Sequence, residues 1–163
     1  MRITGKVWVF GDNVNTDLIY PGTSFRLPID EQAKLVFSAN RPGWTDQVRP
    51  GEIILAGRNF GTGSARPAAT LFRVLRLGGL LADSINGVFY RNCVNNGFPA
   101  LQCPGVRGAF VEGDVAEMDL VSGIVKNLRT GACVRGMAVP ESIVKIIAAG
   151  GILELLRLEG YLD

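Results

Sequence analysis

Short apolar runs alternate with longer mixed stretches through the first two thirds of the chain. The apolar runs have the length of strands, and they predict strands at Lys6–Phe10, Glu52–Ala56, Leu80–Ala82 and Phe98–Cys103. The mixed stretches predict helices at Asp30–Phe37, Arg66–Leu77 and Gly87–Asn95. Strands and helices that alternate in this way predict βαβ units in the middle of the chain.

Two of these helices carry end signals. Asp30 is a candidate N-cap, because its carboxylate can accept a hydrogen bond from a free backbone N–H of the first turn. Pro67 suits the first turn of the second helix, where its missing N–H is no loss. Gly78 and Gly79 follow that helix and are expected to close it.

The last third of the chain has the pattern of antiparallel hairpins. Ala116–Val121 and Ile124–Leu128 are predicted strands, separated by the turn Ser122-Gly123. Two further helices are predicted at Glu141–Ala149 and Ile152–Leu158. No repeat, linker or low-complexity block interrupts the chain, so residues 1–163 are expected to form a single mixed α/β domain.

Composition narrows the range of partners. The hydrophobic share of 47% and the charged share of 20% are those of an ordinary globular protein. A net charge of +2, with dispersed basic residues, argues against nucleic acid as a partner. No apolar run approaches the length of a membrane span, and the opening MRITGKVWVF is too short and β-like for a signal peptide. We therefore expect a cytoplasmic protein with no membrane partner.

Cysteine and histidine usage restricts the chemistry. Cys93, Cys103 and Cys133 are an odd set whose spacing fits neither a disulfide framework nor a closed zinc site, so no metal site is expected in this chain. The chain has no histidine, which excludes His-based triads and most catalytic zinc sites. Any proton transfer must use Ser, Tyr, Cys, Lys or a carboxylate.

The most informative segment is GRNFGTGSARPAA, Gly57–Ala69. Gly61 and Gly63 allow a sharp turn directly before Ser64, Arg66 and a predicted helix. Free backbone N–H groups at a helix start attract anions, and an arginine can bind a carboxylate or phosphate through two hydrogen bonds. The segment therefore predicts a site for a small anion.

Two other interpretations of this loop are open. GTGSAR contains G-x-G, and Asp83 follows about twenty residues later, as a dinucleotide-binding fingerprint requires. However, Arg66 occupies the position of the third glycine, where helix and sheet should pack closely. The loop could also be a purely structural strand-to-helix turn.

Two further polar clusters flank the glycine loop in sequence. The first is GDNVNTDLIYPG, Gly11–Gly22, which by itself resembles any Asx-rich turn. The second is FYRNCVNNGFP, Phe89–Pro99, whose simplest interpretation is a solvated helix face with an Asn-Gly C-cap.

Taken in order, the three clusters resemble one family. D-N-x-x-T-D-x-I-x-P-G at Asp12–Gly22, G-x-N-F-G-x-G-S at Gly57–Ser64 and F-Y-R-N at Phe89–Asn92 are similar to the small subunit of 3-isopropylmalate dehydratase. The resemblance extends to A-G-G-I-L-E-L-L at Ala149–Leu156. It implies a swivelling β/β/α domain with a mixed central sheet, like the swivelling domain of aconitase.

The resemblance also implies a function. The small subunit would dock on a separate large subunit that holds a [4Fe–4S] cluster, and no cofactor would be bound by this chain. The pair would interconvert 2-isopropylmalate and 3-isopropylmalate in leucine biosynthesis. Ser64 would be the catalytic base, and Arg66, Gly63, Asp17 and Arg26 would contact the hydroxy-acid substrate. The isolated small subunit could form a homo-oligomer.

The chain departs from the family pattern at two places. The family usually has G-S-S-R-E-H where this chain has G-S-A-R-P-A, and S-F-A-R-I where it has Ser84-Ile85-Asn86-Gly87-Val88. Arg26 could meet an additional substrate carboxylate or could be an ordinary surface arginine. The alternatives are therefore a homoaconitase-, methylmalate- or dimethylmalate-type small subunit, a docking paralogue without a base, and a stand-alone anion or nucleotide binder.

Overall fold

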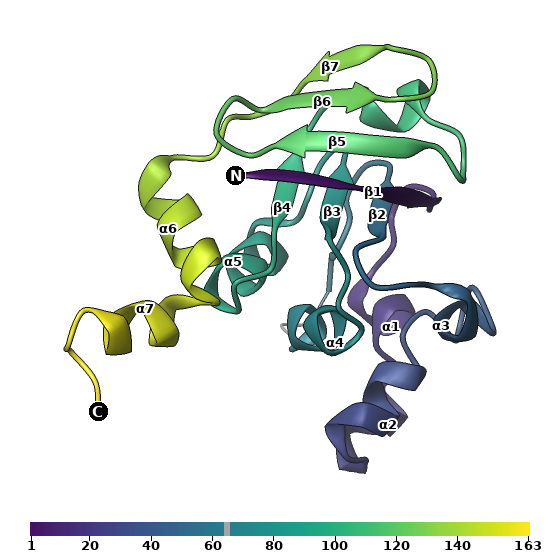
Figure 1. The fold of residues 1–163 in the computed structure, drawn as a ribbon. Coiled ribbons are helices and arrows are strands. Elements are labelled where there is room, and N and C mark those ends of the chain that lie inside the picture. The colour runs from purple at the N-terminus through teal and green to yellow at the C-terminus, as the bar shows by residue number, and fades with distance from the viewer. Residues whose placement is uncertain (64–65) are drawn as a thin grey trace.

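The computed structural model describes residues 1–63 and 66–163. Within them, seven strands form one sheet in the order β4-β3-β2-β1-β5-β6-β7 (Figure 1). The strands are β1 Arg2–Val9, β2 Ile53–Ala56, β3 Gly79–Ala82, β4 Ala100–Gln102, β5 Val115–Asp119, β6 Ile124–Asn127 and β7 Cys133–Arg135. Strands β1 to β4 are parallel, whereas β5 to β7 pair antiparallel, so the predicted α/β fold with a mixed sheet is confirmed.

Strand β1 joins the two halves of the sheet. Its last residues, Val7 to Val9, pair in parallel with β2, and residues Arg2 to Lys6 pair antiparallel with β5. The parallel half contains the βαβ units expected from the sequence, and the antiparallel half contains the expected hairpins. One strand therefore connects the two kinds of structure through its own hydrogen bonds.

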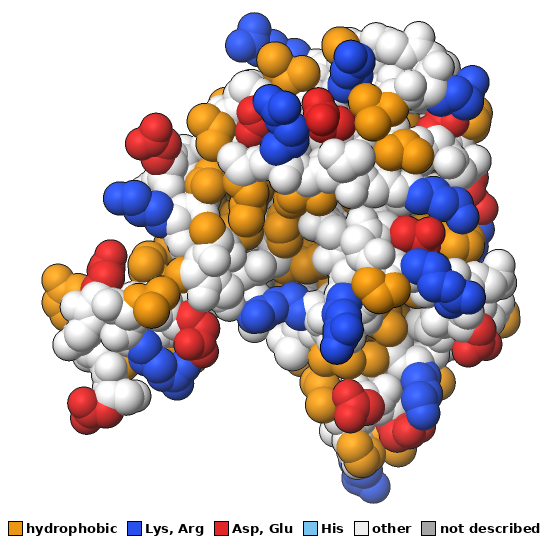
Figure 2. Space-filling view, viewed as in Figure 1, with side chains coloured by type: hydrophobic (Ala, Val, Ile, Leu, Met, Phe, Trp, Pro, Cys, Tyr) orange, Lys and Arg blue, Asp and Glu red, His pale blue; other side chains and the backbone are white. Residues whose placement is uncertain are grey.

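Helices lie around the sheet. They are α1 Thr16–Ile19, α2 Ile29–Lys34, α3 Trp44–Gln47, α4 Ala68–Val74, α5 Gly87–Asn95, α6 Glu141–Ala149 and α7 Ile152–Leu158, with 3-10 turns η1 Gly22–Arg26 and η2 Val106–Ala109. Figure 1 shows α1 to α3 grouped at one end of the molecule and α6 and α7 at the other. In the same view, Figure 2 shows positive and negative side chains interspersed around an apolar hollow below β5.

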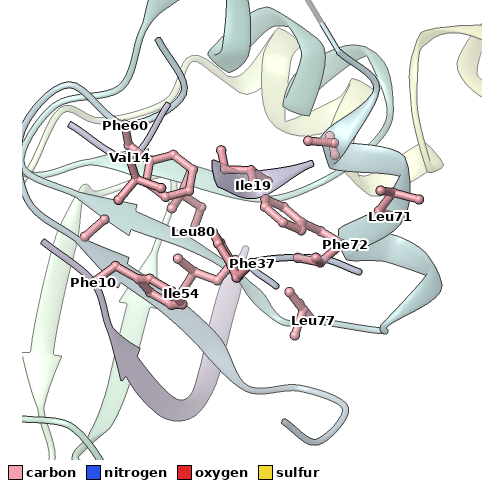
Figure 3. Close-up of a cluster of buried hydrophobic side chains, with 14 of the residues drawn as sticks. Phe10, Val14, Ile19, Phe37, Ile54, Phe60, Leu71, Phe72, Leu77 and Leu80 are labelled. Atoms are coloured by element: carbon pink, nitrogen blue, oxygen red, sulfur yellow. The ribbon is translucent and has the colours of Figure 1, made fainter. Parts of the chain in front are cut away.

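Two hydrophobic clusters cover the opposite faces of the parallel strands. One contains Ile54, Leu80 and the aromatic rings of Phe10, Phe37 and Phe72 (Figure 3). The other contains the alternate strand residues, among them Ile53, Leu55 and Leu81. Strands buried on both faces have continuous apolar sequences, which explains why β2 and β3 could be predicted from short apolar runs.

Comparison of the observed and predicted helix limits shows which helices local sequence signals were sufficient to predict. Helices α5, α6 and α7 have the predicted limits. Helix α2, predicted at Asp30–Phe37, ends at Lys34, and its N-cap is Pro28, so the predicted cap at Asp30 is wrong. Phe37 has a φ of 58° and stacks on Phe10 with ring centroids 4.3 Å apart. A left-handed residue cannot continue a helix, and burial of its ring in the core holds it there.

Helix α4 is also shorter than predicted. It spans Ala68–Val74 rather than Arg66–Leu77, and Pro67 is its N-cap instead of lying in its first turn. Arg76 has a φ of 55°, which turns the chain towards β3 before Gly78. Gly79 belongs to β3, where a Cβ would lie 2.3 Å from Met118 Cε. This glycine is therefore required by close packing against β5 rather than by a helix end.

Candidate active site

The candidate site lies where the parallel strands end. The loop after β1 and the loop after β2 run side by side beyond these ends, the region of an open α/β sheet where ligands bind. Four backbone hydrogen bonds join the loops: Gly57 N to Gly11 O at 3.1 Å, Asn13 N to Arg58 O at 2.7 Å, Gly61 N to Val14 O at 2.8 Å, and Thr16 N to Thr62 O at 2.8 Å. The first two polar clusters of the sequence therefore form one structural unit.

Side chains reinforce this connection. The Asp12 carboxylate accepts hydrogen bonds from the backbone N–H of Arg58 at 2.8 Å and from its Nη2 at 3.0 Å. The backbone hydrogen bond is the main cause of a lowered pKa of Asp12. Asn59 Nδ2 donates to Asn13 Oδ1 at 2.9 Å, and both asparagines have positive φ, 59° and 57°. Asparagine tolerates this conformation better than most residues, so the polar sequence here has a structural role.

The third cluster supports the loop by packing. Phe89 of F-Y-R-N lies on α5, and its ring meets that of Phe60 edge to face with centroids 5.4 Å apart. A Cβ at Gly61, whose φ is 78°, would lie 2.3 Å from Phe89 Cγ. The expected Asn-Gly cap is present, since Asn96 is the C-cap of α5 and Gly97 has a φ of 65°. Arg91 is exposed.

Gly63 and Thr16 make the closest approach between the two loops. Gly63 has a φ of 107°, and a Cβ there would lie 2.7 Å from Thr16 Oγ1. Only glycine fits both this conformation and this space. Thr16 itself is 2% exposed, and its Oγ1 has no hydrogen-bond partner among the described residues.

Arg66 is held at the rim by three neighbours. Its guanidinium forms an ion pair with Asp17, and Nη1 donates a hydrogen bond to the Tyr20 carbonyl at 2.5 Å. The guanidinium carbon lies 5.6 Å from the centre of the Phe25 ring. The Arg66 side chain is 16% exposed and that of Asp17 is 70% exposed. An anion from solvent can therefore approach Arg66 by replacing Asp17.

The structure brings together several of the predicted site residues. Asp17, Gly63 and Arg66 lie at one place, where the two loops meet. Arg26 is exposed at the end of η1 and forms no ion pair with the described residues. Ser64, the predicted base, lies outside the described residues. The expected anion seat differs in one respect, because Arg66 and Pro67 precede α4 instead of forming its first turn.

Sequence reasoning missed three neighbours of these residues. Thr16 stood in the D-N-x-x-T-D motif but received no role, because its approach to Gly63 joins segments that are distant in the chain. Tyr20, the C-cap of α1, contributes its carbonyl, and Phe25 in η1 contributes its ring. Neither role has a signal in the sequence, since both residues are distant from Arg66 in the chain.

The cysteines lie away from these loops. Cys93 and Cys103 are buried, and burial raises the pKa of both thiols, that of Cys103 to about 11. Cys133 is exposed. Within the described residues, no group of three or more His, Cys, Asp or Glu side chains could hold a metal ion. None of the described helices has both the length and the apolar character needed to span a membrane.

A cavity of about 360 Å³ lies elsewhere, beside the edge strand β4. Its lining includes Tyr90, Gln102, Met137, Ala138 and Pro140. No predicted site residue is among them.

Comparison with known proteins connects this geometry to a family. The family model of the aconitase C-terminal domain matches residues 12–105. The 3-isopropylmalate dehydratase small subunit 1 of Methanopyrus kandleri is 39% identical over 97% of this chain and 94% of that protein. The chain belongs to this small-subunit family. Of the recognised motifs, D-N-x-x-T-D-x-I-x-P-G and the described part of G-x-N-F-G-x-G-S lie in the two hydrogen-bonded loops, and F-Y-R-N lies in α5.

Two further similarities bear on fold and substrate. The crystal structure of 3-isopropylmalate dehydratase from Methanocaldococcus jannaschii matches with a TM-score of 0.90 and 28% identity, covering 98% of this chain and 95% of that chain. A methanogen homoaconitase small subunit from Methanothermobacter thermautotrophicus is 39% identical over 93% of this chain and 88% of that protein. Members of this small-subunit family therefore carry names that imply different hydroxy acids.

Proposed function

We propose that this chain is the small subunit of a heteromeric [4Fe–4S] hydro-lyase that interconverts 2-isopropylmalate and 3-isopropylmalate in leucine biosynthesis. The observation that carries the proposal is the position of Arg66. It follows the glycine-rich loop, two residues after Ser64 in the sequence, and the carboxylate of Asp17 is bound to its guanidinium. A substrate carboxylate has the same chemistry as the Asp17 side chain and can take its place.

Ser64 is the base in this mechanism. As an alkoxide it removes the proton alpha to a substrate carboxylate, and the C–H electron pair forms the new C=C bond as hydroxide leaves. The serine hydroxyl then returns its proton when water adds back at the other carbon. A serine alkoxide needs an electropositive surrounding, which Arg66 helps to provide. The chain has no histidine, so a serine base agrees with its composition.

Arg66 orients the substrate for this step. A planar guanidinium can bind a carboxylate through two parallel hydrogen bonds, which fixes the position of the carbon beside it. The Tyr20 carbonyl and the Phe25 ring keep the guanidinium in place when Asp17 is displaced. Asp17 thus contacts the site in the free subunit by holding Arg66, and Gly63 allows the substrate to approach the backbone.

The large subunit completes the site. Its [4Fe–4S] cluster would supply the Lewis acid for the departing hydroxyl. The cysteines of this chain do not suit such a cluster, because Cys93 and Cys103 are buried with raised thiol pKa values and a cluster needs thiolates. We propose that the free small subunit is inactive and that it can associate with itself until the large subunit binds.

A homoaconitase-type substrate is the second candidate. The similarity to the methanogen homoaconitase small subunit favours it, together with the exposure of Arg26 one residue after Phe25. An additional carboxylate on a longer acid would reach Arg26 while the first carboxylate stays on Arg66. The homoaconitase candidate therefore predicts that Arg26 affects longer acids and leaves isopropylmalate unaffected.

The decisive experiment is reconstitution with the large subunit under anaerobic conditions. The complex would be assayed against 3-isopropylmalate, citramalate, 2,3-dimethylmalate, homocitrate and citrate. Formation of an unsaturated acid, absent when either subunit is omitted, is the expected result, with isopropylmalate as the preferred substrate. A cluster-loaded complex that converts none of the five acids would contradict the proposal.

A further inference from the structure

The cavity beside β4 lies at the same end of the sheet as the glycine loop. Gln102 is the last residue of β4, and it lines the cavity together with Tyr90, Met137, Ala138 and Pro140. The last three belong to the segment that connects β7 with α6 (Figure 1). Strands β2, β3 and β4 are parallel, so the carboxyl end of β4 points in the same direction as the strand ends that carry the candidate site.

Hydrogen bonds connect the cavity to the glycine loop. Phe60 of that loop forms a β-bridge with Ile85, and Asn86 N donates to the Phe60 carbonyl at 2.8 Å. From there, Ile85 N donates to Gln102 Oε1 at 3.0 Å, and Gln102 Nε2 donates to Met137 Sδ at 3.1 Å. A protein that covers the glycine loop and extends across these strand ends therefore also meets the cavity.

The lining of the cavity suits an apolar side chain. None of its five residues is charged, and the volume is about 360 Å³. Tyr90 is half-buried, and desolvation raises the pKa of its phenol, so the ring stays neutral. Met137 is 59% exposed although it is apolar. Tyrosine and methionine are enriched at protein interfaces, and a charged group would lose its hydration in such a cavity.

The start of α5 extends this uncharged surface. Val88 is 43% exposed, and a Cβ at Gly87 would have no atom within 4 Å. The family pattern S-F-A-R-I has an arginine where this chain has Gly87. An interface selects its partner by matching charge with charge and apolar surface with apolar surface. The surface that covers this region is therefore expected to be apolar and to lack an anion facing Gly87.

We propose that an apolar side chain of the cluster-bearing large subunit inserts into this cavity and anchors the small subunit over the shared active site. This inference rests on the proposed function, in which the large subunit completes the site. A second copy of this chain is a poorer occupant, because it would lie across the strand ends that the large subunit must cover. Apolar anchors that fill a pocket on the partner contribute much of the binding energy of an interface.

The test measures the Kd between the free small subunit and the cluster-loaded large subunit by anaerobic titration calorimetry, without substrate. Ala138 is exposed and lines the cavity, so its side chain can be changed without disturbing the core. Ala138→Glu places a charge on the apolar lining, and Ala138→Trp fills the cavity from within. We expect Kd to rise about 10- to 100-fold in both variants, as for loss of an interface anchor.

The matched control is Ile124→Glu. Ile124 is a 45% exposed apolar residue on β6, in the antiparallel half of the sheet, so the same charge is introduced away from the cavity. Its Kd should equal that of the wild type. The melting temperatures of the free Ala138→Glu and Ile124→Glu subunits should both stay close to that of the wild type, because neither substitution buries a charge in the core.

Wild-type affinity in both Ala138 variants would overturn the inference, and so would an equal loss of affinity in Ile124→Glu. Weaker binding confined to a variant with a lowered melting temperature would also overturn it. If the Ala138 variants abolished self-association of the free subunit, measured by sedimentation, and bound the large subunit normally, the occupant would be a second copy instead. A wild-type complex that forms but converts none of the hydroxy acids would refute the proposed function, whereas the Kd values would still decide the role of the cavity.

Discussion

Polar side chains near the two halves of the sheet differ in how their hydrogen bonds are satisfied. In the antiparallel half, the carboxylate of Asp114 is 4% exposed and accepts hydrogen bonds from Asn127 Nδ2, Arg129 and the backbone of Val111. In the parallel half, the guanidinium of Arg66 is bound by the exposed Asp17, and the hydroxyl of Thr16 has no partner in the described chain. The buried Asp114 is thus fully satisfied by its protein neighbours, whereas Arg66 is paired with an exposed carboxylate and Thr16 Oγ1 has no partner among the described residues.

This contrast separates stability from function. Loss of a hairpin polar group should lower the free energy of unfolding and leave the chemistry intact. Loss of the Ser64 hydroxyl or of the Arg66 guanidinium should lower turnover and leave the fold intact. Each of the following variants tests one side of this comparison.

The largest effect is expected for Ser64→Ala in the reconstituted complex. Removal of a general base typically costs about 10²- to 10⁴-fold in rate, so kcat should fall by that factor. Association with the large subunit, measured by gel filtration, should be unchanged because the substitution removes only one oxygen atom. Near-normal turnover in a complex of normal cluster content would remove Ser64 from the mechanism.

Arg66→Lys should have the next largest effect. Lysine keeps the charge but cannot form two parallel hydrogen bonds with a carboxylate or stack as a plane on Phe25. A charge-assisted hydrogen bond contributes about 1.5–3 kcal/mol, so kcat/KM should fall about 10- to 100-fold. The melting temperature of the free subunit should change little. Unaltered kinetics would show that Arg66 is only a structural partner of Asp17.

The fold was more predictable from the sequence than the site was. Helices α5, α6 and α7 have local end signals, such as the Asn86 cap and the turn at Gly150, and their limits agree with the prediction. Helices α2 and α4 end early because Phe37 and Arg76 turn into the left-handed region. Burial of Phe37 against Phe10 is a long-range contact, which local propensity does not contain.

For the site residues, too, long-range contacts could not be predicted from the sequence. The glycine loop, Asp17 and Arg66 could be named from motifs, because glycine spacing and charge are visible in the sequence. Their contacts could not be derived, since the Arg66–Asp17 pair and the Thr16–Gly63 approach join segments that are distant in the chain. Sequence reasoning therefore identified the chemical groups, and the paired loops determine which of them meet.

In the hairpin half, Asp114→Asn should destabilise the protein. The substitution weakens the acceptor for Arg129 and Asn127, and we expect the free energy of unfolding to fall by about 1–3 kcal/mol. Turnover per folded molecule in the complex should be normal. Chemical denaturation of the free subunit measures the first quantity and activity normalised to folded protein the second. A large loss of turnover in fully folded Asp114→Asn would contradict the proposed separation of stability from function.

The pH dependence of stability gives a second test of Asp114. The hydrogen bond from Arg129 is the main cause of the strongly lowered pKa of this carboxyl in the folded state. A group with a lowered folded pKa stabilises the protein above its unfolded pKa of about 3.9, and this contribution is lost as pH falls below that value. The wild type should therefore lose stability between about pH 4 and pH 2 more steeply than Asp114→Asn. Parallel curves would indicate that Arg129 does not stabilise the carboxylate.

The smallest effect is expected where the two loops meet solvent. Arg58 is 73% exposed, and its ion pair with Asp12 should contribute less than about 1 kcal/mol because water and salt screen it. Arg58→Gln should therefore barely change the unfolding free energy, and the difference should shrink further in high salt. Asp12→Ala should cost more, because the backbone N–H of Arg58 also loses its acceptor. If Arg58→Gln were the more damaging of the two, the side-chain ion pair rather than the backbone hydrogen bond would hold the loops together. The glycine loop would then depend on the surrounding salt concentration instead of being fixed by its own backbone.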